Sequence, residues 1–244
     1  MIGLPDQVTA CLFDLDGVLT TTADLHRQAW KETFDTFLRE RDGTGFRAFT
    51  DHDYAEYVDG RPRADGVRTF LASRDIVLPE GEADDGPDKP TVHGVGNRKN
   101  ERLLRLIDER GVTPYPGSVR YLQAARDAGR DIAVVSSSAN AAKVLDAAGL
   151  SHFVQTIVDG LVIEHDKLRG KPAPDSFLAG ARKLGVHPQN AAVFEDALAG
   201  VQAGRAGGFG FVVGVNRANQ ADELRAHGAD VVVDDLADLL EEHR

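Results

Sequence analysis

The chain has 244 residues, of which 42% are hydrophobic and 27% charged, and its formal net charge at pH 7 is −11. This composition is typical of a globular protein with a substantial core, and the length allows one large domain or two unequal ones. The negative charge argues against nonspecific binding to nucleic acid or to anionic membranes, so we expect neither as a partner. Any phosphate site must therefore be built locally from basic side chains, backbone amides and metal.

The first apolar run contains Cys11, the single cysteine of the chain. No disulfide can form within the chain, and we expect Cys11 to be a small buried hydrophobe. Residues 1–6 lack a basic region followed by an apolar core, and no apolar run approaches the length of a membrane span. We therefore expect a cytoplasmic protein.

Short apolar runs along the chain are typical of buried parallel strands. These runs are residues 10–13, 132–135, 191–194, 209–213 and 231–233. Helical periodicity occupies residues 118–128, 139–148, 175–184 and 197–206. Alternation of strands and helices predicts an α/β fold with a doubly wound, Rossmann-like parallel sheet.

The segment 23–108 does not follow this alternation and is predicted to be an inserted helical domain. Its helical periodicity lies in residues 25–40, 66–74 and 100–110. The predicted core is therefore 1–22 plus 109–244. Within the insertion, residues 79–90 are rich in Pro, Gly and acidic residues, which predicts an exposed loop.

The motif Asp14-Leu15-Asp16-Gly17 directly follows the first predicted strand. Because side chains alternate along a strand, Asp14 and Asp16 should project the same way. Two carboxylates that lose hydration together repel each other unless a cation or a shared proton relieves the cost. With Mg²⁺ between them, one can act as a nucleophile while the other transfers protons. The alternative is a turn with solvated acids.

Three further polar groups follow strands or precede helices, where open α/β sheets bind ligands. The segment from Ser136 to Asn140 suits a phosphate or an ordinary helix cap. Glu195 and Asp196 could complete an oxygen cage for Mg²⁺, or form a turn. Lys171, followed by Pro172 and Pro174, which restrict the backbone, could neutralise a transferring phosphoryl group or be a solvated charge. The four groups in this order favour a phosphoryl-transfer site.

These motifs resemble, over nearly the whole chain, the haloacid dehalogenase superfamily of phosphotransferases. The resemblance implies that Asp14 is the nucleophile that forms an aspartyl-phosphate and that Asp16 is the general acid and base. It also implies that Ser136, Ser137 and Lys171 bind the transferring phosphoryl group.

The same resemblance implies a Mg²⁺ site. The ion would be held by the Asp14 carboxylate, the Asp16 backbone carbonyl and Asp196, with Glu195 close by or acting through water. Mg²⁺ is the expected cofactor.

Further residues resemble the beta-phosphoglucomutase-like family, in which the inserted helices form a cap. In that family the cap arginine grips the phosphate that is not reacting. The corresponding cap and substrate residues are Thr22, His26, Trp30, Arg63, Lys99, Ser138 and Asn140. Without the resemblance, His26 and Trp30 could simply share a core face, four residues apart on one helix, and Arg63 and Lys99 could be solvated.

The chain departs from the family at two positions. Thr21 stands where the family commonly has Asp, which we expect to alter a hinge contact only. Ala139 stands where the family has a basic residue between the ligands of the second phosphate. This departure weakens the expected hold on that phosphate, although Lys143, one helical turn onward, could compensate.

The resemblance implies a Mg²⁺-dependent phosphomutase that interconverts beta-D-glucose 1-phosphate and glucose 6-phosphate through an aspartyl-phosphate and glucose 1,6-bisphosphate. The expected partner is thus a small-molecule sugar phosphate, and we expect a monomer. The first alternative is a phosphatase acting on hexose or trehalose phosphate. A phosphoaspartate signalling receiver is disfavoured by the chain's length and helical insertion, and an inactive binding module by the presence of every phosphoryl-transfer group.

Overall fold

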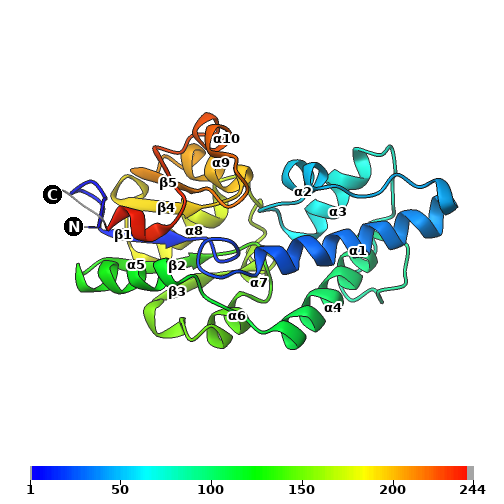
Figure 1. Cartoon of the computed structure of the whole chain (residues 1–244), viewed down its shortest axis with the longest axis horizontal. Coiled ribbons are helices and arrows are strands. Elements are labelled where there is room, and N and C mark those ends of the chain that lie inside the picture. Colours follow the sequence, from blue (N-terminus) through cyan, green and yellow to red (C-terminus); the bar gives the residue numbers. More distant parts are fainter. Residues whose placement is uncertain (1, 241–244) are drawn as a thin grey trace. The chain divides into compact units, whose positions relative to one another are not determined.

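The structure is a computed structural model in which residues 2–240 are described. The chain forms two compact units (Figure 1). Unit 1 comprises Met1–Thr21 and Val112–Arg244, and unit 2 comprises Thr22–Gly111. The prediction placed these boundaries after residue 22 and before residue 109.

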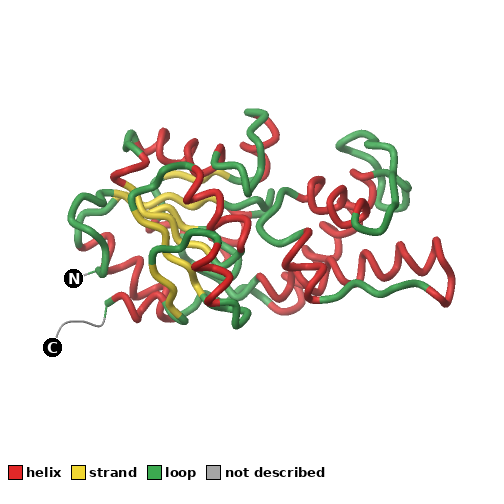
Figure 2. The backbone as a smooth tube through the Cα atoms, turned by 90° about the horizontal axis from the view of Figure 1, so that it is seen from above, coloured by secondary structure: helices red, strands yellow, loops and turns green. Residues whose placement is uncertain are grey.

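The described residues of unit 1 form a six-stranded sheet in the order β3-β2-β1-β4-β5-β6, with every neighbouring pair parallel. The strands are β1 (Ala10–Phe13), β2 (Asp131–Val135), β3 (Thr156–Val158), β4 (Ala191–Glu195), β5 (Phe211–Val215) and β6 (Val231–Val233). Figure 2 shows the strands enclosed by helices. The prediction of an α/β doubly wound sheet is confirmed.

Helices pack on both faces of this sheet because the side chains of its strands alternate between the faces. Leu12 belongs to the same buried cluster as Phe177 of α8. On the other face, Phe13 stacks on Phe194 with ring centroids 4.3 Å apart and meets Tyr121 of α5 edge-on at 6.1 Å. The helices of unit 1 are α5 (Pro116–Asp127), α6 (Ala141–Ala147), α7 (Gly160–His165), α8 (Asp175–Leu184), α9 (Leu198–Ala206) and α10 (Ala221–Ala226).

Cys11 is buried in β1, as predicted. Burial raises the pKa of its thiol to about 12, with Arg130 opposing the shift, so the thiol stays protonated at neutral pH.

The structure differs from the predicted elements at two strands. Strand β3 was not predicted, because its three residues are too short to give a recognisable period. Strand β5 begins at Phe211 rather than at residue 209. Just before it, the Gly210 amide donates to the carbonyls of Pro188 and Ala191. Helices α7 and α10, each of six residues, were also missed.

Unit 2 consists of helices, and all of its residues are described, with none in a strand. Its helices are α1 (Ala23–Asp42), α2 (Asp51–Tyr57), α3 (Arg63–Ala72) and α4 (Val92–Arg110). Aromatic rings fill its core: Phe34 stacks on Trp30 at 5.0 Å and contacts Phe70 at 4.2 Å. The short helix α2, which was not predicted, begins at a capping box formed by Thr50 and Asp53.

Helix α4 begins at Val92, well before the predicted residue 100, because the Thr91 hydroxyl caps it by accepting the Gly94 amide at 3.0 Å. The loop before it is only partly as predicted. Most of its residues are exposed, but the Asp85 carboxylate is buried and binds Lys89 Nζ at 2.6 Å and Thr91 Oγ1 at 2.7 Å. This buried carboxylate organises the loop.

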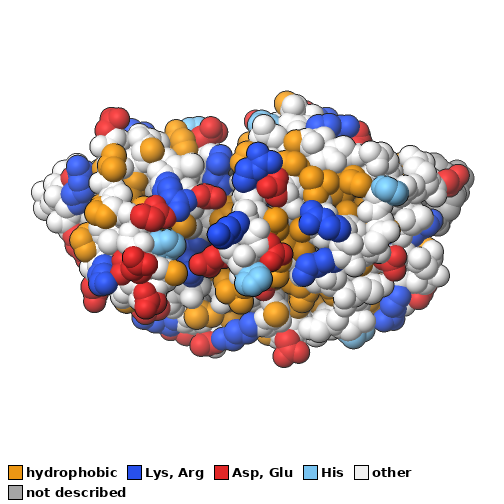
Figure 3. Space-filling view, turned by 180° about the vertical axis from the view of Figure 1, so that it is seen from behind, with side chains coloured by type: hydrophobic (Ala, Val, Ile, Leu, Met, Phe, Trp, Pro, Cys, Tyr) orange, Lys and Arg blue, Asp and Glu red, His pale blue; other side chains and the backbone are white. Residues whose placement is uncertain are grey.

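Acidic and basic side chains are interspersed with hydrophobic ones on the face shown in Figure 3. Within residues 2–240, no helix combines the length and the apolar character that crossing a membrane requires.

Candidate active site

The predicted catalytic groups of unit 1 meet at the carboxyl ends of the central strands of the sheet. Strand β1 pairs with both β2 and β4, so the carboxyl ends of these three strands are neighbours. The chain leaves them at Asp14, Ser136 and Glu195, while Lys171 comes from the segment before α8. In doubly wound sheets, ligands usually bind at the carboxyl ends of the strands, at the point where successive connections diverge.

Lys171 is 1% exposed and joins two of the predicted acidic groups. Its Nζ donates to Asp14 Oδ1 at 2.5 Å, to Glu195 Oε1 at 2.7 Å and to the Val135 carbonyl at 3.2 Å. Burial alone would lower the pKa of Lys171, but the Asp14 and Glu195 carboxylates outweigh it and raise that pKa. A permanent positive charge therefore lies against Asp14.

Glu195 is fully buried, and each of its carboxylate oxygens has a partner within the protein. Oε1 binds Lys171, and Oε2 accepts the Ala197 amide at 2.7 Å. Glycine at position 200 leaves room for this carboxylate, since a Cβ there would lie 1.7 Å from Oε1. Burial raises the pKa of Glu195 to about 7, with Lys171 opposing the shift. Its predicted role beside a metal stays a prediction; in this arrangement Glu195 holds Lys171.

Asp14 and Asp16 lie in a tight loop that continues β1. The Asp14 amide donates to the Phe194 carbonyl at 2.9 Å, which extends the ladder between β1 and β4 by one residue. The Asp14 side chain is nearly buried, whereas Asp16 is partly exposed. Ser136 Oγ makes a long contact of 3.4 Å to Asp16 Oδ2, so the two predicted carboxylates and the predicted phosphate ligand are neighbours.

The segment after β2 shapes itself with its own hydroxyls. Ser136 Oγ accepts the Ser138 amide at 3.1 Å, and Ser138 Oγ accepts the Asn140 amide at 3.2 Å. Ser136 is buried, whereas Ser137, Ser138, Ala139 and Asn140 are partly exposed at the edge of the sheet. Lys143 is exposed on α6.

Asp196 lies against the backbone of the loop after β1. A Cβ at Gly17 would lie 1.9 Å from Asp196 Oδ2, and Gly17 has φ +89°, so both the space and the backbone favour glycine there. Within residues 2–240, no three Asp, Glu, His or Cys side chains form a preassembled cage for a metal. The oxygens offered by Asp14, Asp16 and Asp196 nevertheless suit Mg²⁺, which commonly takes one or two carboxylates and keeps several waters.

The predicted cap residues of unit 2 also gather, around the middle of α4. Lys99 is buried, with Nζ 3.0 Å from His26 Nδ1 and 4.9 Å from the centroid of the Trp30 ring. The side chain of Arg63 packs against α4 at Gly96, one turn before Lys99. Thr22 is buried where α1 begins. Trp30 is part of the aromatic core of unit 2, which agrees with the alternative that this residue lies on a core face of its helix.

We expect His26 to stay neutral in the folded protein when the pH falls below the ordinary pKa of histidine. Burial, and then the charge of Lys99, lowers its pKa well below 6.5. The unfolded chain takes up this proton near pH 6.5 and the folded chain does not, so acidification through this range destabilises the protein by at most about 1.4 kcal/mol per pH unit.

NMR titration of the His26 ring and denaturant unfolding at about pH 7.5 and 5.5 check this prediction. The variant His26→Gln keeps a hydrogen-bond acceptor for Lys99. Its free energy of unfolding should depend less on pH than that of the unchanged protein, because the contribution of His26 is gone. A His26 ring that titrates near pH 6.5 in the folded protein would contradict the expectation.

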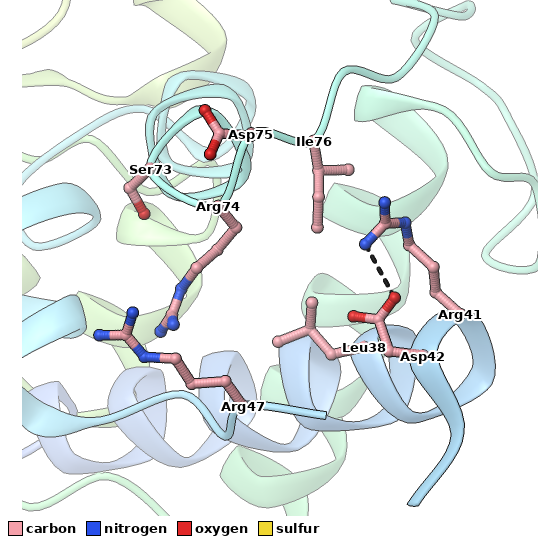
Figure 4. A pocket seen from close by; sticks show the side chains of 8 residues that line it. All are labelled: Leu38, Arg41, Asp42, Arg47, Ser73, Arg74, Asp75 and Ile76. Carbon is pink, nitrogen blue, oxygen red and sulfur yellow. Dashed lines mark hydrogen bonds and ion pairs between the residues drawn. The ribbon is translucent and has the colours of Figure 1, made fainter. Parts of the chain in front are cut away.

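A cavity of about 290 Å³ lies elsewhere in unit 2 (Figure 4). Two of the arginines that line it are paired with carboxylates. Arg41 pairs with Asp42 at 2.8 Å, and Arg74 pairs at 2.6 Å with Asp53, which is not a lining residue. The cavity holds none of the predicted site residues, and its charges largely cancel. Its lining consists of Leu38, Arg41, Asp42, Arg47, Ser73, Arg74, Asp75 and Ile76.

Two residues beside the site were not predicted. Arg217 Nε donates to the Gly17 carbonyl at 2.7 Å, and Gln220 Nε2 donates to the Asp196 carbonyl at 2.9 Å. The available signal was their position, in a polar stretch directly after a predicted strand, but polar loops are common there.

Comparison with known proteins identifies the family. Residues 8–208 match the haloacid dehalogenase-like hydrolase family. The chain is 56% identical to the beta-phosphoglucomutase of Mycobacterium bovis, over 98% of this chain and 94% of the relative. It is 33% identical to the beta-phosphoglucomutase of Bacillus subtilis, over 94% of this chain and 91% of the relative.

A solved structure agrees with these relatives. The crystal structure of beta-phosphoglucomutase from Clostridium difficile is similar to this chain with a TM-score of 0.73 and 28% identity, over 95% of this chain and 93% of that one. Sequence, sheet order and clustered acidic groups point the same way. The chain therefore belongs to the haloacid dehalogenase-like hydrolase family and is an enzyme.

Proposed function

We propose that this enzyme is a beta-phosphoglucomutase, which interconverts beta-D-glucose 1-phosphate and glucose 6-phosphate. The site observation that carries the proposal is the buried Lys171 ammonium, 2.5 Å from Asp14 Oδ1. It joins a carboxylate nucleophile to a fixed positive charge, which is what phosphoryl transfer requires. The substrate is inferred from the mycobacterial relative, with which this chain is 56% identical.

In the proposed reaction, an Asp14 oxygen attacks the phosphorus of beta-glucose 1,6-bisphosphate. The bond from phosphorus to the sugar oxygen breaks, and Asp16 gives that oxygen a proton. In the other half-reaction a sugar hydroxyl attacks the aspartyl-phosphate, and its proton passes to Asp16. Lys171, with Ser136 and Ser137, would bind the phosphoryl oxygens and disperse their charge.

Mg²⁺ is the proposed cofactor, held by the Asp14 carboxylate, the Asp16 carbonyl and Asp196, with Glu195 nearby. When bound, it would add positive charge beside the transferring phosphoryl group. Within this chain, Glu195 keeps the Lys171 ammonium in reach of Asp14, because both partners of that ion pair are buried.

For the sugar bisphosphate, we propose that Arg63 and Lys99 of unit 2 and Ser138 and Asn140 of unit 1 bind the phosphate that is not reacting. Thr22, His26 and Trp30 are proposed as supporting residues of unit 2. The contact between His26 and Lys99 supports this grouping, because a neutral ring nitrogen accepts a hydrogen bond from the ammonium and leaves its charge intact.

A sugar-phosphate phosphatase is the second candidate, and one observation favours it. Ala139, between Ser138 and Asn140, offers no charge to a second phosphate. A weaker hold on the bisphosphate gives water more time to attack the aspartyl-phosphate, which would release phosphate instead of the isomerised sugar.

The test is incubation with beta-glucose 1-phosphate, MgCl₂ and a trace of beta-glucose 1,6-bisphosphate, with glucose 6-phosphate and free phosphate assayed together. We expect glucose 6-phosphate to form without matching phosphate release. Removal of the divalent cation with EDTA should abolish the conversion, and added MgCl₂ should restore it. Dominant phosphate release with little isomerised sugar would contradict the mutase and favour the phosphatase.

A further inference from the structure

The loop of residues 216–220, between β5 and α10, lies beside the catalytic groups but takes no part in the proposed reaction. From this loop, Arg217 Nε donates to the Gly17 carbonyl at 2.7 Å, and Nη1 donates to the Asp234 carbonyl at 2.8 Å. The guanidinium also stacks on Tyr115, 3.7 Å from the ring centroid. One side chain thus ties together the loop after β1, the start of α5 and the end of β6.

A second tie leaves the other end of the same loop. Gln220 Nε2 donates to the Asp196 carbonyl at 2.9 Å. Asn216 braces the loop internally, because its Oδ1 accepts the Gln220 amide at 2.8 Å and its Nδ2 donates to Asp234 Oδ1 at 2.8 Å. Arg217 and Gln220 are therefore fixed relative to each other.

The two carbonyls that are held belong to the loops bearing the acidic groups. Gly17 directly follows Asp16, and with φ +89° and no side chain its backbone could adopt many other conformations. The Asp196 carboxylate packs against this same glycine. A rotation at Gly17 would therefore move both the Asp16 carbonyl and the surface on which Asp196 rests.

The chemistry of arginine suits this role better than that of lysine. A planar guanidinium can bind two carbonyls in fixed directions while stacking on an aromatic ring, whereas an ammonium on a flexible chain cannot.

We propose that the 216–220 loop is a positioning clamp for phosphoryl transfer. Arg217 holds the Gly17 carbonyl and Gln220 holds the Asp196 carbonyl. The oxygens of Asp16 and Asp196 are therefore fixed in position before a divalent cation or a phosphate binds. The inference rests on the proposed function for its effect on turnover, but its effect on cation binding can be measured without any sugar.

The test compares Arg217→Ala, Arg217→Lys and Gln220→Ala with the unchanged protein. The matched control is Arg205→Ala, because Arg205 also binds a backbone carbonyl of unit 1, that of Gly228, through Nε at 3.1 Å and Nη2 at 2.8 Å. Calorimetric titration with MgCl₂ alone measures cation binding. The rate at which acetyl phosphate phosphorylates Asp14, followed by intact mass, measures reactivity, and kcat and KM are measured on the sugar phosphate.

We expect Arg217→Ala to weaken Mg²⁺ binding about 10- to 100-fold, as loss of outer-sphere support commonly does, and to lower kcat similarly with KM little changed. Arg217→Lys should recover less than half of the loss on a logarithmic scale, and Gln220→Ala should show a smaller loss. Arg205→Ala should lower the melting temperature without changing Mg²⁺ binding.

Equal Mg²⁺ binding by Arg217→Ala and Arg205→Ala would overturn the clamp, as would absence of Mg²⁺ binding by the unchanged protein. If Arg217→Ala does not fold, the Mg²⁺ affinities of Arg217→Lys and Gln220→Ala test the clamp instead. Wild-type affinity in both of these variants would overturn the proposal. A protein that binds Mg²⁺ and forms the aspartyl-phosphate but makes no glucose 6-phosphate would contradict the proposed mutase while leaving the clamp supported by its cation-binding result.

Discussion

Asp14→Asn is expected to lower kcat by about four orders of magnitude or more, because an amide is a far poorer nucleophile than a carboxylate. Asn has nearly the shape of Asp and still offers an oxygen to Lys171, which lies 2.5 Å from Asp14 Oδ1. The fold should therefore persist. The measurement is kcat together with the mass of the protein after exposure to acetyl phosphate.

Asp16→Asn is the matched control for this prediction, because it changes a carboxylate in the same loop. It should still accept a phosphoryl group on Asp14 from acetyl phosphate, whose leaving group needs no proton, but should turn over the sugar phosphate poorly. Phosphorylation of Asp14→Asn at the wild-type rate would show that another residue is the nucleophile.

Lys171→Met is expected to lower the free energy of unfolding by about 3–5 kcal/mol and to abolish measurable turnover. Lys171 is buried between Asp14 and Glu195, so its removal leaves two carboxylates facing each other without a counter-charge. Denaturant unfolding with and without MgCl₂ would measure the loss, because a bound cation can replace part of the missing charge.

The same variant should become more stable as the pH falls. Burial already raises the pKa of Glu195 to about 7, and without Lys171 the main influence opposing that shift is lost. The folded variant then binds a proton that the unfolded chain releases above its ordinary carboxyl pKa, so stability falls as the pH rises between these values. The double variant Lys171→Met with Glu195→Gln should recover much of the loss at pH 7. No recovery would show that the two buried groups are not coupled.

The sequence predicted the central strands well because each is a short apolar run that ends in polar residues. Helix α8 coincides with its predicted range, since its apolar face has a clear period. The sequence failed where tertiary contacts decide the local structure. Strand β3 exists because three residues pair with β2, and the beginning of α4 depends on Thr91 as its cap.

The residue types of the candidate site were predictable, but their pairing was not. Lys171 lies 157 residues after Asp14 and 24 residues before Glu195. No local pattern indicates that the Lys171 ammonium binds both carboxylates. Arg217 was beyond prediction for a related reason. Its partner is the backbone carbonyl of Gly17, and a carbonyl is present at every position of the chain.

The two ends of the long insertion leave unit 1 side by side. The Thr21 amide donates to the Thr113 carbonyl at 3.0 Å, and Thr20 forms a bridge with Pro114. The ninety residues Thr22–Gly111 are thus inserted between β1 and α5 and interrupt no strand of the sheet. Evolution could shorten, enlarge or exchange such a module without rethreading any strand. Under the proposed function, new substrates could be recruited by changing this module, while the catalytic groups of unit 1 are inherited unchanged.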